Sequence, residues 1–538
     1  MSTRPPRLWP AVLIVGLGAA AVAKAWLLDD TIRQYHVMQT LVATILTLVG
    51  LLLWLAFFSR LPGRTRLVAL GAIFLTFGVS ASLFRIRGMS GDLLPIVDFR
   101  WSQGEPPPLQ PEAPPPTPEP KATAQAAEAT ASTPVKAKGA TAIPLEPLAP
   151  ASPGWPQFQG PNRDATVLGT RLARDWTRQP PRLVWRRAVG SGWSSFAIKD
   201  GLAVTQEQRG PNELVVAYDF ATGRPRWSHT NEARFDNVVA GVGPRATPTI
   251  ADGRVFALGA TGILNALDLA TGRLLWSHRT VEENGGAQAM WGKSGSPLVS
   301  SGRVIVSAGG TEGRALVAYA AQTGERVWAG GHDGASYSSP QLVTLAGRPE
   351  VIVFNDASVA GHDPDTGALL WEQPWPGEQP NVAQPLPLGD DRLLFSAGYG
   401  VGSKVYALAA DDSTDARMRL VWESPRLKSK FANLILHEGF VYGLDDGVLT
   451  CLDPATGERR WKGGRYGHGQ LLLVGGLLLV QTEEGEAILI DPSPEAPREL
   501  TRAALLEGKT WNPPALVGSR LLVRNDREAA LYELPLAE

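Results

Sequence analysis

ALDLATGRLLW (266–276) decides the fold, because it is one copy of a phrase that returns along the second part of the chain. The phrase has a small residue, an Asp, then Thr-Gly, and a Trp four residues after the Gly. The other copies are AYDFATGRPRW (217–227), AYAAQTGERVW (318–328), GHDPDTGALLW (361–371) and CLDPATGERRW (451–461). A recurring unit of this kind indicates a solenoid, a propeller or an array.

The phrase predicts β structure. An apolar or alternating run precedes each turn, the Asp can accept backbone N–H bonds, and the Gly supplies the positive φ that such a hairpin loop requires. Upstream lies a second hairpin, for example TPTIADGRVFALGA (247–260). Four short antiparallel strands per unit are the content of one propeller blade.

The repeat Trp residues count the blades and predict how the ring closes. They fall at intervals of 39 to 52 residues, and two weaker units follow at 470–502 and 513–538. The last unit stops after its third strand, whereas LVWRRAV (183–189) is a strand with no hairpin before it. Pairing the two ends would remove the open sheet edges. We therefore predict eight blades with an N-terminal closing strand, built by Trp185, Asp219, Gly223, Trp227, Asp268, Gly272, Trp276, Gly324, Trp328, Gly367, Trp371, Asp453, Gly457 and Trp461.

The Ala-x-Asp-x-x-Thr-Gly-x-x-x-Trp phrase resembles the PQQ-like (quinoprotein-type) β-propeller repeat over about two thirds of the chain. WPQFQGPNRDATV (155–167) also resembles the leading segment of such propellers. The family includes dehydrogenases of alcohols and glucose that depend on pyrroloquinoline quinone (PQQ), and propellers without enzyme activity such as the lipoprotein of the outer-membrane β-barrel assembly machine. Three departures stand out: Ala320 replaces the Asp, the fifth unit carries DDSTDARM (411–418), and the seventh lacks the Gly and Trp. The resemblance implies an all-β, eight-bladed PQQ-like propeller and leaves its function divided.

The repeat residues are better explained by structure than by a cofactor. Blade periodicity predicts that the Trp residues dock blade against blade, and metal ligands at the repeat Asp positions would be scattered around the ring. We expect no metal site there. A site should lie where the innermost strands begin, around the channel. Those starts contribute Trp193, Arg245, Trp291, Lys293, Tyr337, Asn381, Gln384, Lys430, Asn433, Arg465, His468, Trp511 and Asn512.

This set is cationic and aromatic and favours a planar or anionic ligand. The alternative is that it caps and fills the channel entrance. It contains no carboxylate, whereas a PQQ dehydrogenase of the resembled family needs Ca²⁺ ligands and an Asp base. The vicinal Cys pair of many such enzymes cannot form, because Cys451 is the only Cys. We expect no catalytic residue and no cofactor, and keep a membrane-bound PQQ and calcium dehydrogenase donating electrons to the quinone pool as the alternative.

The chain divides into a membrane domain (1–100), a Pro/Ala-rich disordered linker (101–154) and the propeller (155–538). Apolar stretches at 9–28, 38–58 and 66–84 predict three spans, of which the second is uncharged over 21 residues. The first also fits a cleaved secretory signal. Arg60, Arg64 and Arg66 follow the second stretch, so the positive-inside rule places the propeller outside the inner membrane, in the periplasm.

Charge and composition restrict the partners. A formal net charge of -1 and the lack of a basic stripe exclude general attraction to nucleic acid. Cys451 stands where other repeats have Ala and is expected to be a small buried hydrophobe. The sequence therefore favours a membrane-anchored, non-catalytic scaffold whose partners are envelope proteins or peptides, held at blade loops or strand edges.

Overall fold

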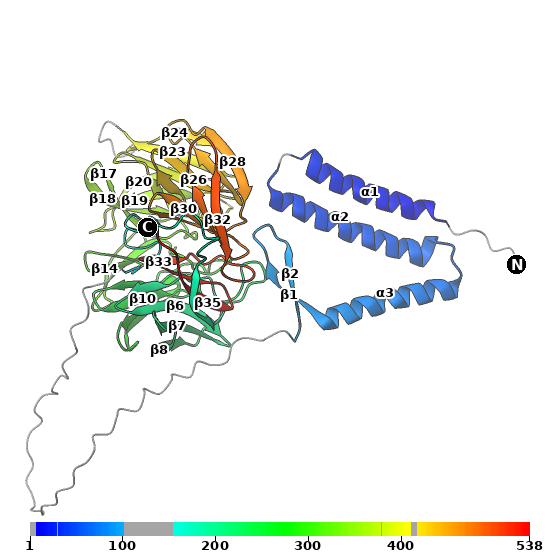
Figure 1. Ribbon diagram of the computed structural model, residues 1–538, viewed down its shortest axis with the longest axis horizontal. Helices are drawn as coiled ribbons and strands as arrows, with labels where there is room; N and C mark the ends of the chain where they lie inside the picture. The colour runs from blue at the N-terminus through cyan, green and yellow to red at the C-terminus, as the bar shows by residue number, and fades with distance from the viewer. Residues whose placement is uncertain (1–6, 30, 102–153, 378, 410–416, 538) are drawn as a thin grey trace, which may run out of the picture.

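The computed structural model describes residues 7–29, 31–101, 154–377, 379–409 and 417–537 and has a helical part and a ring of sheets (Figure 1). The helical part consists of α1 (Trp9–Leu27), α2 (Arg33–Leu53) with its π-helical continuation η1 (Trp54–Phe58), and α3 (Gly63–Leu83). The predicted linker lies outside the described residues, except for 101 and 154.

All three helices are long and apolar enough to cross a membrane. Their bounds lie close to those of the predicted spans. Helix α2 begins earlier than its predicted span, at Arg33, because it includes a polar first turn that the apolar stretch did not mark. The end of α1, the start of α2 and the end of α3 face the ring, and the α2–α3 connection lies at the far end of the helices (Figure 1).

A short hairpin follows α3 and was not predicted. Its strands β1 (Phe84–Met89) and β2 (Pro95–Phe99) are antiparallel, with Ile86 opposite Val97. The hairpin lies between α3 and the ring (Figure 1). Residues assigned from sequence to the membrane domain therefore reach the propeller.

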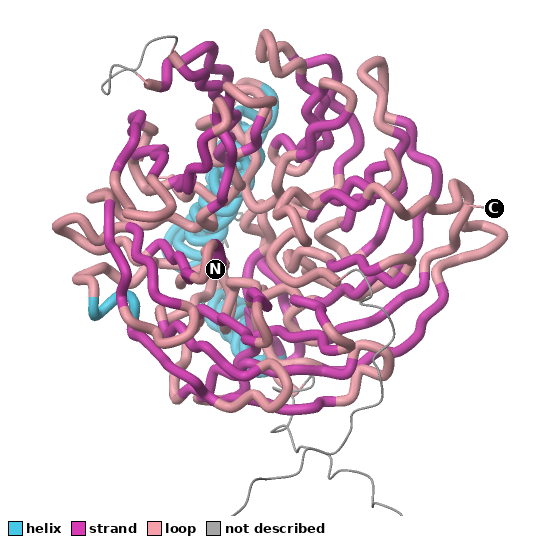
Figure 2. Tube along the Cα trace, turned by 90° about the vertical axis from the view of Figure 1, so that its left-hand side faces the viewer, coloured by secondary structure: helices cyan, strands magenta, loops and turns pink. Residues whose placement is uncertain are grey.

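The ring has eight sheets, each with four successive antiparallel strands apart from the closing one, and the helices lie behind it when it is viewed face-on (Figure 2). The blades are β5 (Ala197–Lys199), β6 (Leu202–Arg209), β7 (Asn212–Asp219), β8 (Pro225–Asn231); β9 (Thr249–Ala251), β10 (Arg254–Leu258), β11 (Ile263–Asp268), β12 (Leu274–Arg279); β13 (Leu298–Ser300), β14 (Arg303–Ser307), β15 (Leu316–Ala320), β16 (Arg326–Gly330); β17 (Gln341–Leu345), β18 (Arg348–Phe354), β19 (Ser358–His362), β20 (Leu369–Pro374); β21 (Leu386–Pro387), β22 (Arg392–Ala397), β23 (Gly402–Leu408), β24 (Met418–Ser424); β25 (Ile435–His437), β26 (Phe440–Asp445), β27 (Val448–Leu452), β28 (Arg459–Arg465); β29 (Gln470–Val474), β30 (Leu477–Gln481), β31 (Glu486–Asp491), β32 (Arg498–Ala504); and β33 (Ala515–Val517), β34 (Arg520–Arg524), β35 (Glu528–Glu533). A short helix, α4 (Thr280–Glu283), follows β12.

The eighth blade closes as predicted. Strand β4 (Arg182–Ala188) pairs antiparallel with β35, with Trp185 opposite Leu531. A further strand, β3 (Thr166–Val167), runs parallel to β29 on the seventh blade. The eight-bladed, all-β prediction is confirmed.

Fully buried Arg524 ties the closing blade to the first. Its guanidinium donates to Thr205 Oγ1 at 2.6 Å and to Gln206 O and Gly190 O at 3.0 Å. These bonds cross the junction between β34 and β6. Chain closure therefore rests on strand pairing and on a charged hydrogen-bond anchor.

Every repeat Trp except Trp371 donates its indole N–H to a backbone carbonyl of the next blade. Trp227 Nε1 donates to Leu269 O at 2.9 Å, and Gly272, with a φ of 71°, lies directly against the Trp227 ring. A side chain at Gly272 would penetrate that ring. The same indole bond to the next blade is made by Trp185, Trp276, Trp328, Trp422 and Trp461.

The repeat Asp residues stabilise the turn beside that Gly. Asp268 Oδ1 accepts bonds from Thr271 N at 2.9 Å and Thr271 Oγ1 at 2.6 Å, and these bonds lower the pKa of Asp268. Asp219 and Asp363 make the same pair of bonds. The Asp and Thr of the phrase therefore stabilise a turn that places its Gly against the Trp of the preceding blade.

Trp371, in the fourth blade, makes a different contact because the next blade lacks the repeated phrase. The fifth blade has no Thr-Gly turn to receive it, and Trp371 Nε1 instead donates to buried Glu350 within its own blade at 2.7 Å. Arg417 pairs with the same carboxylate at 2.5 Å. A local polar pair replaces the regular contact at this junction.

Candidate functional site

The starts of the inner strands surround a cavity of about 160 Å³ at the channel mouth. Seven of the residues predicted at the starts of the inner strands line it: Trp193, Arg245, Trp291, Tyr337, Gln384, Asn433 and Trp511. Phe158, Tyr399, Phe431 and Gln470 also line the propeller side. The opposite wall includes Gln34 of α2 and the hairpin residues Ser90, Gly91 and Leu93.

Aromatic contacts organise the propeller side of this cavity. Trp511 lies between Trp193, with ring centroids 5.0 Å apart, and Phe431, at 4.8 Å. On another side, Trp291 contacts Tyr337 at 5.5 Å and Tyr399 at 6.1 Å. The cavity is therefore an aromatic chamber more than a charged one.

Several predicted cationic and amide residues are used within the fold. Lys293 Nζ donates to Ser307 O at 3.2 Å and Ala308 O at 2.8 Å, and burial lowers its pKa to about 8. Asn381 Nδ2 donates to Asn355 O at 2.7 Å. Arg245 donates to Ala240 O at 3.0 Å and Gly241 O at 2.8 Å, and burial lowers its pKa to about 9. These three side chains cap backbone groups and offer little to a ligand.

Lys430 and His468 instead hold the tip of the β1–β2 hairpin. His468 Nε2 lies 3.1 Å from Asp92 Oδ1, and Lys430 Nζ lies 3.4 Å from Gly91 O. Gly91 N donates to Glu483 Oε1 at 2.7 Å. Burial opposes ionisation of Asp92, but His468, Lys430 and Arg33 together hold its pKa below the ordinary value. The hairpin tip is seated in the mouth by charge-assisted bonds.

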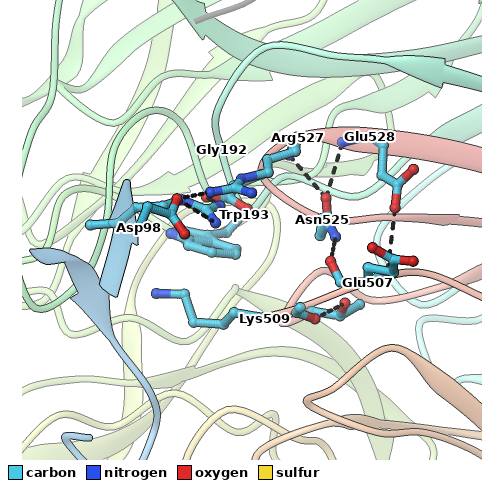
Figure 3. A network of polar contacts seen from close by, with 12 residues as sticks. Asp98, Gly192, Trp193, Glu507, Lys509, Asn525, Arg527 and Glu528 are labelled. Carbon is cyan, nitrogen blue, oxygen red and sulfur yellow. Dashed lines mark hydrogen bonds and ion pairs between the residues drawn. The ribbon is translucent and has the colours of Figure 1, made fainter. Parts of the chain in front are cut away.

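The hairpin strands add contacts at the eighth blade. Arg527 pairs with Asp98 on β2, and Arg87 on β1 pairs with Asp526 (Figure 3 shows Asp98 and Arg527). Lys509 Nζ donates to Met89 O at 3.0 Å and lies over the rings of Trp193 and Trp511, at 4.6 and 4.0 Å. Burial lowers the pKa of Lys509 to about 8. The hairpin covers the chamber on the side that faces the helical part.

The carboxylates at the mouth were missed from sequence. Glu483 and Asp446 lie in the turns β30–β31 and β26–β27, and both are buried. Glu483 accepts bonds from Gly91 N, His468 N and Trp511 Nε1, and Asp446 Oδ1 lies 3.0 Å from Lys430 Nζ. In an antiparallel blade the turn between the second and third strands lies at the same end as the start of the first. DDG (445–447) and EEG (483–485) were the signals that could have found them.

Oxygen and nitrogen ligand atoms of Asp92, Asp446 and His468 lie within 4.8 Å of one another. Lys430 already pairs with Asp446, and Arg33 Nε lies 2.9 Å from Asp92 Oδ2. Two cations therefore take the place that a metal ion would need. The cluster joins the hairpin to the ring through ion pairs.

The chamber does not fit PQQ with calcium. No Asp or Glu is among its described lining residues, so it provides neither a carboxylate ligand for Ca²⁺ nor a base for an alcohol proton. The nearby carboxylates of Glu483 and Asp446 are satisfied by the chain itself.

Buried Glu213 next to the chamber should make stability depend on pH. Its Oε2 accepts Ala260 N at 2.9 Å, its Oε1 has no hydrogen-bond partner among the described residues, and burial raises its pKa to about 7 despite Arg245. A raised folded-state pKa stabilises below the unfolded pKa, and that contribution is lost as pH rises through the folded value. We expect Glu213 to cost about 2 kcal/mol of folding stability between pH 5 and pH 7.

Glu213→Gln should abolish this contribution. Thermal unfolding of the full-length protein in detergent, followed by tryptophan fluorescence, should show the variant gaining stability over the wild type as pH rises from 5 to 7. Equal slopes for the two proteins would mean that Glu213 is not held protonated.

Comparisons with known proteins agree with this architecture. The family model described as outer membrane protein assembly factor BamB matches residues 176–290 and 211–463. Solved structures that are similar include BamB from Moraxella catarrhalis (18% identity, TM-score 0.48, covering 66% of this chain and 99% of that one). A europium-containing methanol dehydrogenase (14%, 0.52, 71% and 98%) and the quinohemoprotein alcohol dehydrogenase from Comamonas testosteroni (15%, 0.52, 72% and 81%) are also similar. A search of curated proteins gave no match. At these identities the structural likeness shows the fold alone.

Proposed function

Because the chain belongs to the family described as outer membrane protein assembly factor BamB, whose model matches more than half of its length, we propose that it is a non-catalytic scaffold. The three apolar helices anchor it in the inner membrane, and the propeller stands on the periplasmic side. Its partners are envelope proteins or peptides.

The observation that carries this proposal is the hairpin in the channel mouth. In a quinoprotein the mouth must admit a substrate and leave acids free for the reaction. Here Gly91 and Asp92 occupy it, bonded to Glu483, Lys430 and His468. The channel mouth, where a quinoprotein would hold its cofactor and substrate, here connects the propeller to the β1–β2 hairpin and the helical part.

The outer strands offer the surface for partners. Large apolar side chains are exposed there on blade after blade, near the repeat Trp: Leu183, Leu274, Val327, Leu369, Leu420 and Val421. The last strand of each described blade also has an unpaired edge. An extended apolar peptide can add to such an edge by backbone pairing, with its side chains on the exposed apolar residues.

Incubation of the purified full-length protein with PQQ and Ca²⁺ tests this proposal. We expect no quinone absorbance to stay with the protein after gel filtration, and no dye-linked oxidation of sugars or alcohols. Stoichiometric PQQ retention with substrate-dependent dye reduction would overturn the scaffold and establish the dehydrogenase. A PQQ dehydrogenase assayed in parallel controls for active cofactor.

A further inference from the structure

A second and larger cavity, of about 700 Å³, lies at the junction of the helical part and the ring. We name it the junction cleft. Its helical wall comes from Trp26 near the end of α1, from Thr31 and Ile32, and from the first turn of α2, and its other wall is formed by the fifth and sixth blades and their connection. Neither the channel mouth nor the repeat explains this cleft.

Positive charge dominates its lining. Six cationic side chains line the junction cleft against two carboxylates, Asp445 and Asp446; the cations are Arg33, Arg426, Lys428, Arg459, Lys462 and Arg465. Such an excess in a concave site attracts anions.

Internal ion pairs account for only part of this charge. Lys428 and Lys462 share the buried Asp445, at 2.9 and 2.7 Å, and Arg33 pairs with Asp92. Asp446 pairs with Lys430. Within the described parts of the chain, no carboxylate pairs with Arg426 or Arg459, and both side chains are exposed. The cleft therefore keeps cations that are available to an external anion.

The position of the cleft identifies the source of the anion. Helix α1 ends at Leu27 and α2 begins at Arg33, so the helical wall lies where the two apolar helices emerge toward the ring. Trp26 and Tyr35 line this wall, and Arg33 lies over the Trp26 ring at 5.6 Å. Trp, Tyr and Arg at the end of apolar helices are typical of the level of lipid headgroups.

We propose that the junction cleft binds the phosphate headgroup of an anionic phospholipid in the leaflet that faces the propeller. Arg426 and Arg459 supply the charge for the phosphate, and Trp26 and Tyr35 pack beside the headgroup. The proposal rests on the membrane anchoring in the proposed function. It does not depend on whether the propeller is catalytic.

Native mass spectrometry of the detergent-purified full chain tests this site with two lipids of the same acyl composition. We expect one phosphatidylglycerol to bind at least tenfold more tightly than phosphatidylcholine, whose headgroup is zwitterionic. Arg426→Ala with Arg459→Ala should weaken phosphatidylglycerol binding by about tenfold, because each cation near an anionic headgroup contributes a measurable part of the affinity.

A matched double variant, Arg224→Ala with Arg520→Ala, removes two exposed arginines outside the cleft and should leave binding unchanged. Equal affinity for the two lipids, or equal loss in both double variants, would overturn the proposal. Inorganic phosphate at millimolar concentration should not displace the lipid, and full displacement would identify a free-anion site instead. Carbonate extraction of membranes tests the anchoring separately, since a protein released by carbonate would fail there and not at the arginines.

Discussion

Gly272→Ala is expected to destabilise the full-length protein by about 3–4 kcal/mol, since it combines two costs. Gly272 has a φ of 71°, which an L residue adopts only with strain. Its new Cβ would also enter the buried Trp227 ring, and overpacking in a close-packed core costs about 1–3 kcal/mol by itself. The ring would have to move, and its bond to Leu269 O would be lost.

Gly253→Ala is the matched control for this prediction. Gly253 has a φ of 69°, and no atom lies within 4 Å of the position of its Cβ. It therefore carries the backbone strain without the clash, and its expected cost is about 1 kcal/mol. Thermal and denaturant unfolding in detergent measure both. Similar losses in the two variants would show that Trp227 docking contributes little to the ring.

The propeller could be predicted from sequence because its repeat is a packing unit. Asp268, Gly272 and Trp276 recur at blade spacing because every junction needs the same turn and the same indole contact. The unpaired strand at 183–189 and the last unit, which has only three strands, together indicated one complete blade, because each blade needs four strands. Where the phrase fails, as beside Trp371, the contact fails with it.

The site could be predicted only in part, because the prediction considered only the starts of the inner strands. Trp193, Trp291, Tyr337 and Trp511 do meet at the mouth. Glu483 and Asp446 also arrive there, from turns that the repeat does not mark.

The hairpin was the larger omission. FRIRGM (84–89) and PIVDF (95–99) alternate around a polar turn, which is a hairpin signal. This hairpin signal was overlooked because FRIRGM adjoins the third apolar stretch and was assigned with it to the membrane domain. Its contacts with the ring join residues some 400 positions apart, for example Gly91 and Glu483, and no local pattern encodes them.

The central claim is that the β1–β2 hairpin closes the channel mouth, and an engineered disulfide tests it with an all-or-none result. A Cβ at Gly91 would lie 3.0 Å from the His468 Cβ, below the range of about 3.5–4.5 Å found in disulfides, so the hairpin tip must move outward by about half an ångström for the bond to form. Gly91 has no positive φ, so a side chain there brings no backbone strain. Cys451→Ala removes the only native thiol, at a position where other repeats carry Ala.

The measurement is mass spectrometry of a non-reduced digest after mild oxidation in native membranes, in the Cys451→Ala background. For Gly91→Cys with His468→Cys, we expect nearly complete linkage of the two peptides. Gly91→Cys with Arg520→Cys, whose second position is an exposed site on β34, should give none. Free, alkylatable thiols in the first pair, at the level of the second, would contradict the closed mouth and with it the scaffold that we propose.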